Sequence, residues 1–197
     1  MAGTERDYHG YTPMDYDADS EADEVYQGCL SYLLTHAPVE PEDTVVDIGT
    51  GTGIVALELA SKCDHVVGRD ILDEWLRYAR EKAEQRGIEN VSFDHGSFRE
   101  PNVDEPVDVV VASYAQYMAY DEGGEDELRS AIDGLTSLNS RCVVVADKMR
   151  FGPVHSPSGY ETLPAAGTVS NLLVDSGFTL TDIEIISESV GVVVATR

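Results

Sequence analysis

From residue 44 onward, short apolar runs alternate with longer stretches in which apolar residues recur at helical spacing. The apolar runs predict strands at 44–48, 65–70, 91–95, 107–112 and 141–147. The stretches between and after them predict helices at 54–62, 73–86, 125–138 and 161–176. Apolar strands that alternate with helices are typical of an α/β fold, in which helices cover both faces of a parallel sheet.

The last two apolar runs, 179–187 and 190–196, are separated by only two residues. Such a short connection permits only an antiparallel hairpin, because a parallel crossover needs about a dozen residues or more. The sequence therefore predicts a mixed, doubly wound sheet of seven strands, in which five parallel strands are followed by a closing hairpin.

The N-terminal segment has a different character. Residues 1–20 are polar, contain Gly and Pro and show no periodicity, which predicts a flexible arm ahead of a single domain at 21–197. Tyr8, Tyr11 and Tyr16 are unusual in a merely solvating tail, so the arm either folds over a site or is a frayed end. A helical pattern follows, with Ser20 as the expected N-cap and an end near His36.

The charge is extreme: 37 acidic residues against 13 basic ones give a net charge of −24. An acidic, lysine-poor composition resembles that of proteins from salt-accumulating halophilic archaea, where molar salt screens the self-repulsion. The charge argues against a nucleic-acid partner, although less strongly if it reflects a salty solvent. An acidic protein that binds a basic partner is the alternative.

Other composition features narrow the class of protein. No apolar run is long enough for a membrane span and the N-terminus lacks the apolar region of a signal peptide, so a cytoplasmic protein without a membrane partner is expected. Cys29, Cys63 and Cys142 are widely spaced in apolar stretches, which predicts buried thiols and no metal site.

The most informative stretch is the loop that follows the first predicted strand, Gly49-Thr50-Gly51-Thr52-Gly53, with Asp47 just before it. Glycine permits positive φ and removes the Cβ that would block a ligand, so something is expected to approach this main chain closely. Dinucleotide enzymes use G-x-G-x-x-G, but Ile54 stands where their third glycine would fall. That departure disfavours a nicotinamide-dependent oxidoreductase.

The pattern D-x-G-x-G-x-G resembles motif I of class I S-adenosylmethionine-dependent methyltransferases, and the resemblance covers roughly residues 43–197. It implies a Rossmann-like sheet of order 3-2-1-4-5-7-6 with strand 7 antiparallel, and S-adenosylmethionine as cofactor. Asp70 ends the second strand, where the family places the acid that accepts the ribose hydroxyls, and Ile71 is expected against the adenine. Asp47 is expected to be held by loop N–H groups or by the amino end of the cofactor.

The remaining cofactor contacts implied by the resemblance follow the third and fourth strands. Gly96, Ser97 and Phe98 occupy the place of the family's adenine-side Gly-Asp pair, with Ser97 departing from the usual acid. Ser113 stands at the ligand-side exit of the fourth strand. The full set of expected cofactor-binding residues is Asp47, Gly49, Thr50, Gly51, Gly53, Asp70, Ile71, Gly96, Ser97, Phe98 and Ser113.

The acceptor side is less defined, because methyl transfer from a sulfonium needs positioning more than acid–base chemistry. Tyr114, Tyr117 and Tyr120 would share one face of a helical turn, where they either line an acceptor pocket or pack in the core. Other candidates are Lys148 and Arg150 for an anionic acceptor, and His155 as a base. A methyltransferase acting on a small molecule is favoured, with RNA, protein and a non-catalytic S-adenosylmethionine-binding module as alternatives.

Overall fold

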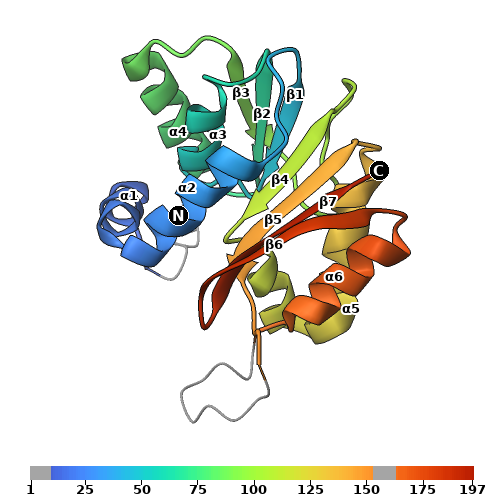
Figure 1. The fold of residues 1–197 in the computed structure, drawn as a ribbon. Helices are drawn as coiled ribbons and strands as arrows, with labels where there is room; N and C mark the ends of the chain where they lie inside the picture. Colours follow the sequence, from blue (N-terminus) through green and yellow to red (C-terminus); the bar gives the residue numbers. More distant parts are fainter. Residues whose placement is uncertain (1–9, 153–162) are drawn as a thin grey trace, which may run out of the picture.

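The computed structural model describes residues 10–152 and 163–197. Seven strands form one sheet in the order β3-β2-β1-β4-β5-β7-β6 (Figure 1). The strands are β1 (Thr44–Ile48), β2 (His65–Asp70), β3 (Val91–His95), β4 (Val109–Ser113), β5 (Cys142–Lys148), β6 (Thr179–Ser187) and β7 (Val190–Thr196). Strands β1 to β5 are parallel, whereas β7 is antiparallel to both β5 and β6. The predicted fold class, strand order and closing hairpin are therefore confirmed.

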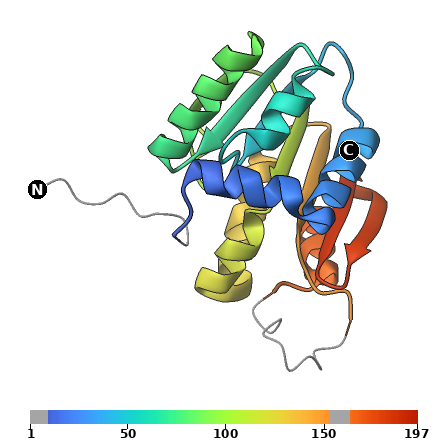
Figure 2. The same ribbon diagram turned by 90° about the vertical axis from the view of Figure 1, so that its left-hand side faces the viewer.

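Helices cover both faces of this sheet (Figures 1 and 2). They are α1 (Pro13–Ala22), α2 (Glu24–His36), α3 (Ile54–Leu59), α4 (Asp73–Arg86), α5 (Gln116–Ser137) and α6 (Ala166–Asp175). One hydrophobic cluster joins α2, α3 and α4 to one face of the sheet, and a second joins α5 and α6 to the other. Strands β1, β2, β4, β5 and β7 are almost fully buried because both of their faces are covered, whereas the edge strands β3 and β6 are partly exposed.

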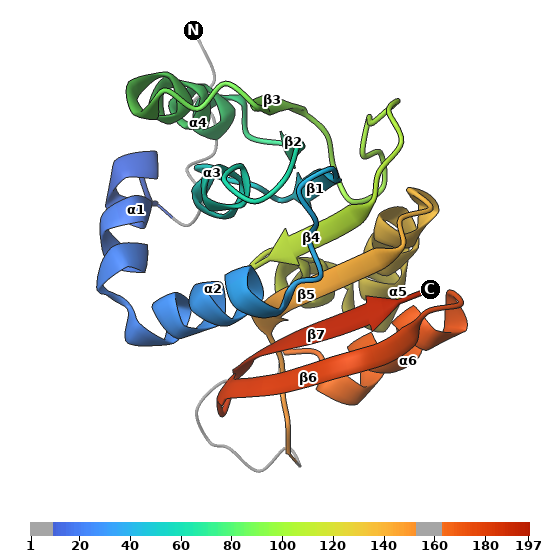
Figure 3. The same cartoon turned by 45° about the horizontal axis from the view of Figure 1, so that its top comes forward.

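The N-terminal helices correct the sequence-based picture of an irregular arm. Pro13–Ala22 is helical, with Pro at the first position and the Thr12 side chain accepting from the Asp15 N–H. Ser20 lies inside this helix, and Asp23 caps α2 instead, accepting from the Val25 N–H at 2.8 Å. Helix α1 packs against α2 and α4, whereas α2 packs against β5, β6 and β7 (Figure 3).

Helix α5 is longer than predicted and is broken in the middle. Gly124 has φ 68° and ψ −147°, which is not helical, and it separates residues 116–123 from the core-packing part of the helix. The predicted helix at 125–138 corresponds to the second part. The first part was missed because Gly123 and Gly124 ended the helical pattern in the sequence. This break lets the two parts face different neighbours.

The other helix boundaries differ by a few residues. The predicted helix 54–62 ends at Leu59, and the predicted helix 161–176 begins at Ala166, with 161–162 outside the described residues. Cys29, Cys63 and Cys142 are buried and free, as expected.

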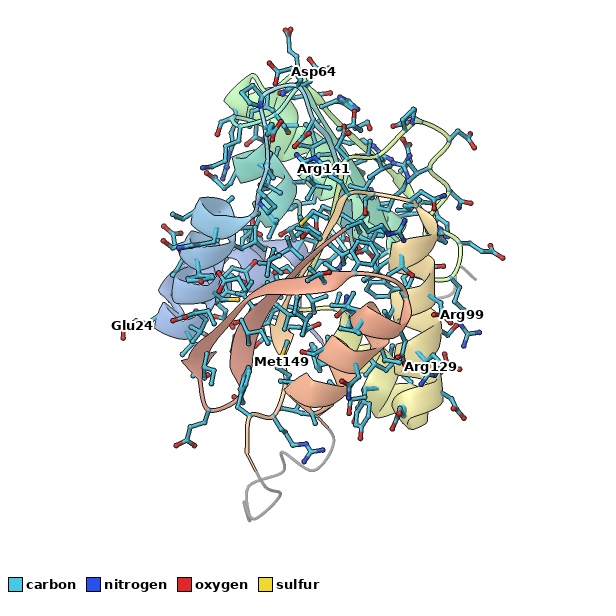
Figure 4. All side chains as sticks on the ribbon, turned by 45° about the vertical axis from the view of Figure 1, so that its right-hand side comes forward. Glu24, Asp64, Arg99, Arg129, Arg141 and Met149 are labelled. Carbon is cyan, nitrogen blue, oxygen red and sulfur yellow. The ribbon has the colours of Figure 1, made fainter. Side chains whose placement is uncertain are left out.

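Charged side chains lie mainly on the outside, where Figure 4 shows Asp64, Arg99 and Arg129 extending from the surface. Within the described residues, none of the helices is long and apolar enough to cross a membrane.

Candidate active site

A cavity of about 610 Å³ opens at the carboxyl ends of β1, β2 and β4. This size is typical of small-molecule sites, and strand ends beside a crossover point are where open α/β sheets bind ligands. Ten of the eleven residues predicted from the sequence line it: Asp47, Gly49, Thr50, Gly51, Asp70, Ile71, Gly96, Ser97, Phe98 and Ser113. The fold therefore brings together residues from four separate strand exits.

The glycine loop presents bare main chain to this cavity. Gly49 and Gly51 have φ of 77° and 54°, which residues with a side chain rarely adopt. The N–H groups of Gly49 and Thr50 donate to the Arg69 carbonyl at 2.8 and 3.0 Å, which fixes the loop against β2. A Cβ at Gly49 would lie 2.6 Å from Ala115 Cβ, so the loop and the exit of β4 meet closely here.

Gly53 is the predicted residue that does not line the cavity. It caps α3 at the N-terminus with φ 78°, and a Cβ there would lie 2.9 Å from Phe93 Cζ and 3.1 Å from Ala79 Cβ. Glycine is required at position 53 because α3 packs closely against β3 and α4. The spacing of the motif could not distinguish this role from a ligand contact.

Asp70 is 9% exposed and is fixed by two backbone donors. Its Oδ2 accepts from the Gly51 N–H at 2.8 Å, and its Oδ1 accepts from the Leu72 N–H at 2.9 Å. Burial raises the pKa of this carboxyl, while these backbone donors oppose the shift. Each carboxylate oxygen has a second lone pair, so Asp70 retains acceptor capacity toward the cavity.

Asp47 is more deeply buried, at 1% exposure. Its Oδ2 accepts from Thr50 Oγ1 at 2.7 Å, whereas its Oδ1 has no hydrogen-bond partner. Burial, with a further contribution from the negative charge of Asp70, raises the pKa of Asp47 to about 7. A buried carboxylate oxygen without a donor is costly, so this atom is the clearest unmet hydrogen-bonding demand at the site.

The β2 and β3 exits supply a partly apolar end of the cavity. Ile71 is 60% exposed although it lines the cavity, and Phe98 is partly buried beside it in the lining. Ser97 Oγ accepts from the Glu100 N–H at 3.1 Å, which leaves its hydroxyl proton and one lone pair available. A Cβ at Gly96 would lie 2.6 Å from the Pro101 carbonyl oxygen, so glycine is needed for this turn.

Two aromatic residues that the sequence did not single out also line the cavity. Tyr26 on α2 and Trp75 on α4 line the cavity, as does Tyr16 on α1. Of the three tyrosines expected in the arm, Tyr16 thus reaches the cavity. The ring of Tyr11 contacts that of Tyr16, with centroids 6.4 Å apart, but Tyr11 does not line the cavity, and Tyr8 lies outside the described residues.

Helix α1 is attached to the site through one carboxylate. Asp17 Oδ1 accepts from Thr52 Oγ1 at 2.5 Å, and its Oδ2 pairs with Lys82 Nζ at 2.6 Å. The Lys82 side chain is only 10% exposed. This polar junction ties α1 to the glycine loop, beside the packing of Tyr16 on Trp75 at 5.2 Å between ring centroids.

Asp147 was also missed, because it acts across the sheet rather than inside the cavity. It is 2% exposed, and its Oδ2 accepts from the N–H groups of Ala115, Gln116 and Tyr117 at 3.2, 2.7 and 3.2 Å. It therefore caps α5 and fixes the exit of β4. Only its place at the end of the fifth predicted strand pointed toward this edge of the sheet.

The three predicted acceptor-side tyrosines do not share one face. Tyr114 precedes α5 with φ 51°, so the helical spacing does not extend to it, and it alone of the three lines the cavity. The Tyr117 ring packs under Lys148 Nζ at 4.7 Å, and Tyr120 packs on the α5–α6 side of the core.

The predicted cations are placed elsewhere. Neither Lys148 nor Arg150 lines the cavity, and Arg150 Nε donates to the Leu163 carbonyl at 2.7 Å. His155 lies outside the described residues.

Comparison with known proteins agrees with this geometry. The sequence profile of the family described as "Methyltransferase domain" matches residues 40–139. An uncharacterized methyltransferase, YcgJ of Bacillus subtilis, is 30% identical over 89 residues, which is 45% of this chain and 35% of that protein. A release factor glutamine methyltransferase of Aliivibrio fischeri is 36% identical over 134 residues, or 66% of this chain and 43% of that protein. The chain thus spans less than half the length of these curated relatives.

Solved structures show the same fold at lower identity. Magnesium protoporphyrin IX methyltransferase from Synechocystis, crystallised with bound SAH, superposes with a TM-score of 0.74 at 18% identity, covering 98% of this chain and 97% of that one. A putative methyltransferase in complex with the Trm112 activator of Haloferax volcanii gives 0.77 at 20% identity, covering 97% and 98%. By its matching family profile, sheet order and cavity, this chain belongs to the class I S-adenosylmethionine-dependent methyltransferases.

Proposed function

We propose that this protein transfers the methyl group of S-adenosylmethionine to a small-molecule acceptor bound in the same cavity. The observation that carries the proposal is the pairing of a bare glycine loop with two buried carboxylates, Asp47 and Asp70, that retain acceptor capacity toward the cavity. A zwitterionic sulfonium nucleoside has the donors that these groups lack.

The residues present fit this cofactor. The unpartnered Asp47 Oδ1 would accept from the ammonium of the methionine end, and the main chain at Gly49 and Gly51 leaves room for it. Asp70 would accept from the ribose hydroxyls with the lone pairs that Gly51 and Leu72 do not use.

The adenine would lie at the partly apolar end of the cavity. Ile71, whose side chain is 60% exposed, gains apolar burial when a ring covers it, and Phe98 lines the same end. The Ser97 hydroxyl retains a lone pair for the adenine amino group, in place of the acid usual in the family. Ser113 and Thr50 complete the predicted contacts.

When bound, S-adenosylmethionine supplies a methyl group that its sulfonium charge has already activated. The chain must then bind the cofactor, exclude water and hold the acceptor atom in line. Tyr16, Tyr26 and Tyr114 provide apolar cover on the side of the cavity opposite the nucleotide end. Burial raises the pKa of all three hydroxyls, Tyr16 to about 12, so they remain neutral near pH 7 and cannot serve as ionised bases.

A small acceptor is supported by the size of the cavity, about 610 Å³, and by the net charge of −24, which opposes an RNA surface. The relatives named above act, by their names, on a protein glutamine and on a porphyrin, so family membership alone does not choose the acceptor. A non-catalytic cofactor-binding module is the second candidate, favoured because no His or Lys is among the described lining residues and two of their three carboxylates, Asp47 and Asp70, are assigned to the cofactor.

Calorimetry in molar KCl tests the cofactor, with NAD as the control. We expect micromolar binding of S-adenosylmethionine and of S-adenosylhomocysteine, and no binding of NAD. A labelled-methyl assay then separates the two candidates: transfer to the small-molecule fraction of an extract supports the enzyme. Binding without transfer to small molecules, RNA or protein would leave only the binding module.

The cellular setting is part of the same proposal. We propose a cytoplasmic protein adapted to high salt, with residues 21–197 as one folding unit, because the acidic excess needs screening and a single sheet runs from residue 44 to 196. Thermal unfolding between about 0.1 M and 3 M KCl tests this, since the Debye length falls from about 10 Å toward 3 Å or less. We expect Tm to rise steeply with salt; a flat or falling Tm contradicts the proposal.

A further inference from the structure

The cavity extends beyond the part assigned to the cofactor. The proposed nucleotide contacts come from the exits of β1, β2 and β3, whereas another set of lining residues comes from α1, α2 and the segment after β4. This second set, called the acceptor wall below, comprises Tyr16, Tyr26, Tyr114, Met118, Ala119 and Glu122. Under the proposed function, it is the surface left for the molecule that receives the methyl group.

Aromatic rings make the acceptor wall continuous. The ring centroids of Tyr26 and Tyr114 are 4.8 Å apart with planes at 42°, and those of Tyr16 and Tyr26 are 6.5 Å apart at 87°. Tyr16 also meets Trp75 at 5.2 Å. These spacings lie in the range in which aromatic rings attract one another, and such a surface favours another flat, apolar ring over a flexible polar chain.

The main chain holds Tyr114 in this wall at a cost. Its φ of 51° is unfavourable for a residue with a Cβ by roughly 1–2 kcal/mol. The Tyr114 N–H donates to the Ala146 carbonyl at 2.9 Å, and the Asp147 carboxylate accepts from the next three N–H groups. Backbone strain that the surrounding structure enforces in this way collects at functional sites.

The break in α5 adds the remaining part of the wall. Met118, Ala119 and Glu122 precede Gly124, whereas the buried core residues of the helix, such as Leu128 and Ile132, follow it. The short first part therefore lines the cavity while the second part packs on the sheet.

Charge on the described lining residues has one sign. Three carboxylates, Asp47, Asp70 and Glu122, line the cavity, and no Lys, Arg or His is among the described lining residues. Lys82, which reaches the glycine loop only through Asp17, is paired with that carboxylate at 2.6 Å. A carboxylate or phosphate of the acceptor, placed on the acceptor wall beside Glu122, would lose its hydration without a described cation to pair with.

Resting on the proposed function, we infer that the acceptor wall binds a flat aromatic small molecule that carries no negative charge, with Tyr26 and Tyr114 as its main contacts. An anionic acceptor or a nucleic-acid acceptor would contradict this inference, and the following experiment detects either one.

The test uses the full chain saturated with S-adenosylhomocysteine in molar KCl and three naphthalene probes of matched size. They are 2-naphthylmethanol, 2-naphthylmethylamine and 2-naphthoate, titrated by calorimetry. We expect the alcohol and the amine to bind at least about tenfold more tightly than the carboxylate, because a buried unpaired anion is costly. Tyr26→Leu and Tyr114→Leu should each weaken the alcohol by about three- to tenfold, the value of a lost aromatic pair.

Tyr32→Leu is the matched control. Tyr32 lies on the same helix as Tyr26, but its hydroxyl bonds Asp182 at 2.5 Å and it does not line the cavity, so probe affinity should not change. Any one of four results would overturn the inference. They are failure of all three probes to bind, equal affinity for 2-naphthoate and the alcohol, displacement of the alcohol by tRNA, and wild-type probe affinity in both leucine variants. The comparison among probes needs no variant, so it stands if a variant does not fold. If the wild-type protein does not bind S-adenosylhomocysteine at all, that result instead contradicts the proposed function.

Discussion

Replacing Asp47 with Asn should stabilise the empty protein and weaken cofactor binding at the same time. Asp47 is 1% exposed, and its Oδ1 has no donor, so the empty site contains a carboxylate whose charged form is poorly solvated. Its pKa is raised from 3.8 to about 7. The folded state therefore retains a proton between about pH 4 and pH 7 that the unfolded chain has already released.

The size of the stability effect follows from that shift. A raised carboxyl pKa stabilises the folded state below the unfolded pKa, and this contribution is lost as the pH rises through the folded pKa. The shift of about three units corresponds to about 4 kcal/mol of unfolding free energy lost by pH 8. Asp47→Asn removes that cost, and the amide oxygen still accepts from the Thr50 hydroxyl. The free energy of unfolding of the empty protein at pH 8 should therefore be up to about 4 kcal/mol higher than in the wild type.

Binding should change in the opposite direction. A hydrogen bond from an ammonium to the charged carboxylate is worth about 1.5–3 kcal/mol, so Asp47→Asn should weaken S-adenosylhomocysteine by roughly 10- to 150-fold at pH 8. With a pKa of about 7, the ionised fraction of Asp47 rises from about 9% at pH 6 to about 91% at pH 8. Wild-type affinity should therefore rise about tenfold over that range, and the variant should lack this rise.

Denaturant unfolding and calorimetry between pH 6 and pH 8 measure both effects. Asp43→Asn is the control, because Asp43 is also buried but pairs with Arg141 at 2.5 Å outside the cavity. That change should destabilise the protein and leave cofactor affinity unaltered. Unchanged affinity of the Asp47 variant at pH 8, or parallel pH profiles for variant and wild type, would refute the reasoning.

Three further changes probe the rest of the site. Asp70→Ala should weaken S-adenosylhomocysteine by about 1.5–3 kcal/mol in calorimetry, and wild-type affinity would remove the ribose assignment. Asp17→Asn should weaken the ion pair between Asp17 and Lys82 that holds α1, and a double-mutant cycle with Lys82→Met should give a coupling of about 1 kcal/mol or more in unfolding free energy. Zero coupling would contradict a stabilising role for this ion pair. Gly49→Ala should lower the free energy of unfolding by more than Gly87→Ala does. Both positions have positive φ, but only a Cβ at position 49 would lie within 3 Å of another atom. Equal losses of unfolding free energy in denaturant titrations would rule out the close contact with Ala115.

The sheet was predictable because its chemistry is local. Residues 109–112 and 142–146 are continuously apolar, as strands covered on both faces must be, and the two-residue link between β6 and β7 allows only a hairpin. Asp47 and Asp70 were expected at the cavity because the glycine motif and the family resemblance place acids at the exits of these two strands, and both line it.

What the sequence did not predict depends on contacts between distant segments. Helix α1 has almost no apolar stripe, and it is held through Asp17 by Thr52 and Lys82, partners 35 and 65 residues away. The Thr12–Pro13 start was a readable capping signal for that helix. The reach of Asp147 to the start of α5, across about 30 residues, left no local pattern to read.

A crystal structure grown with S-adenosylhomocysteine in molar salt tests the central claim most directly. The account predicts the ribose hydroxyls on Asp70, the ammonium within hydrogen-bonding distance of Asp47 Oδ1, and the sulfur facing the acceptor wall. A nucleoside bound elsewhere, or bound in this cavity with Asp47 Oδ1 still unpartnered, would contradict it.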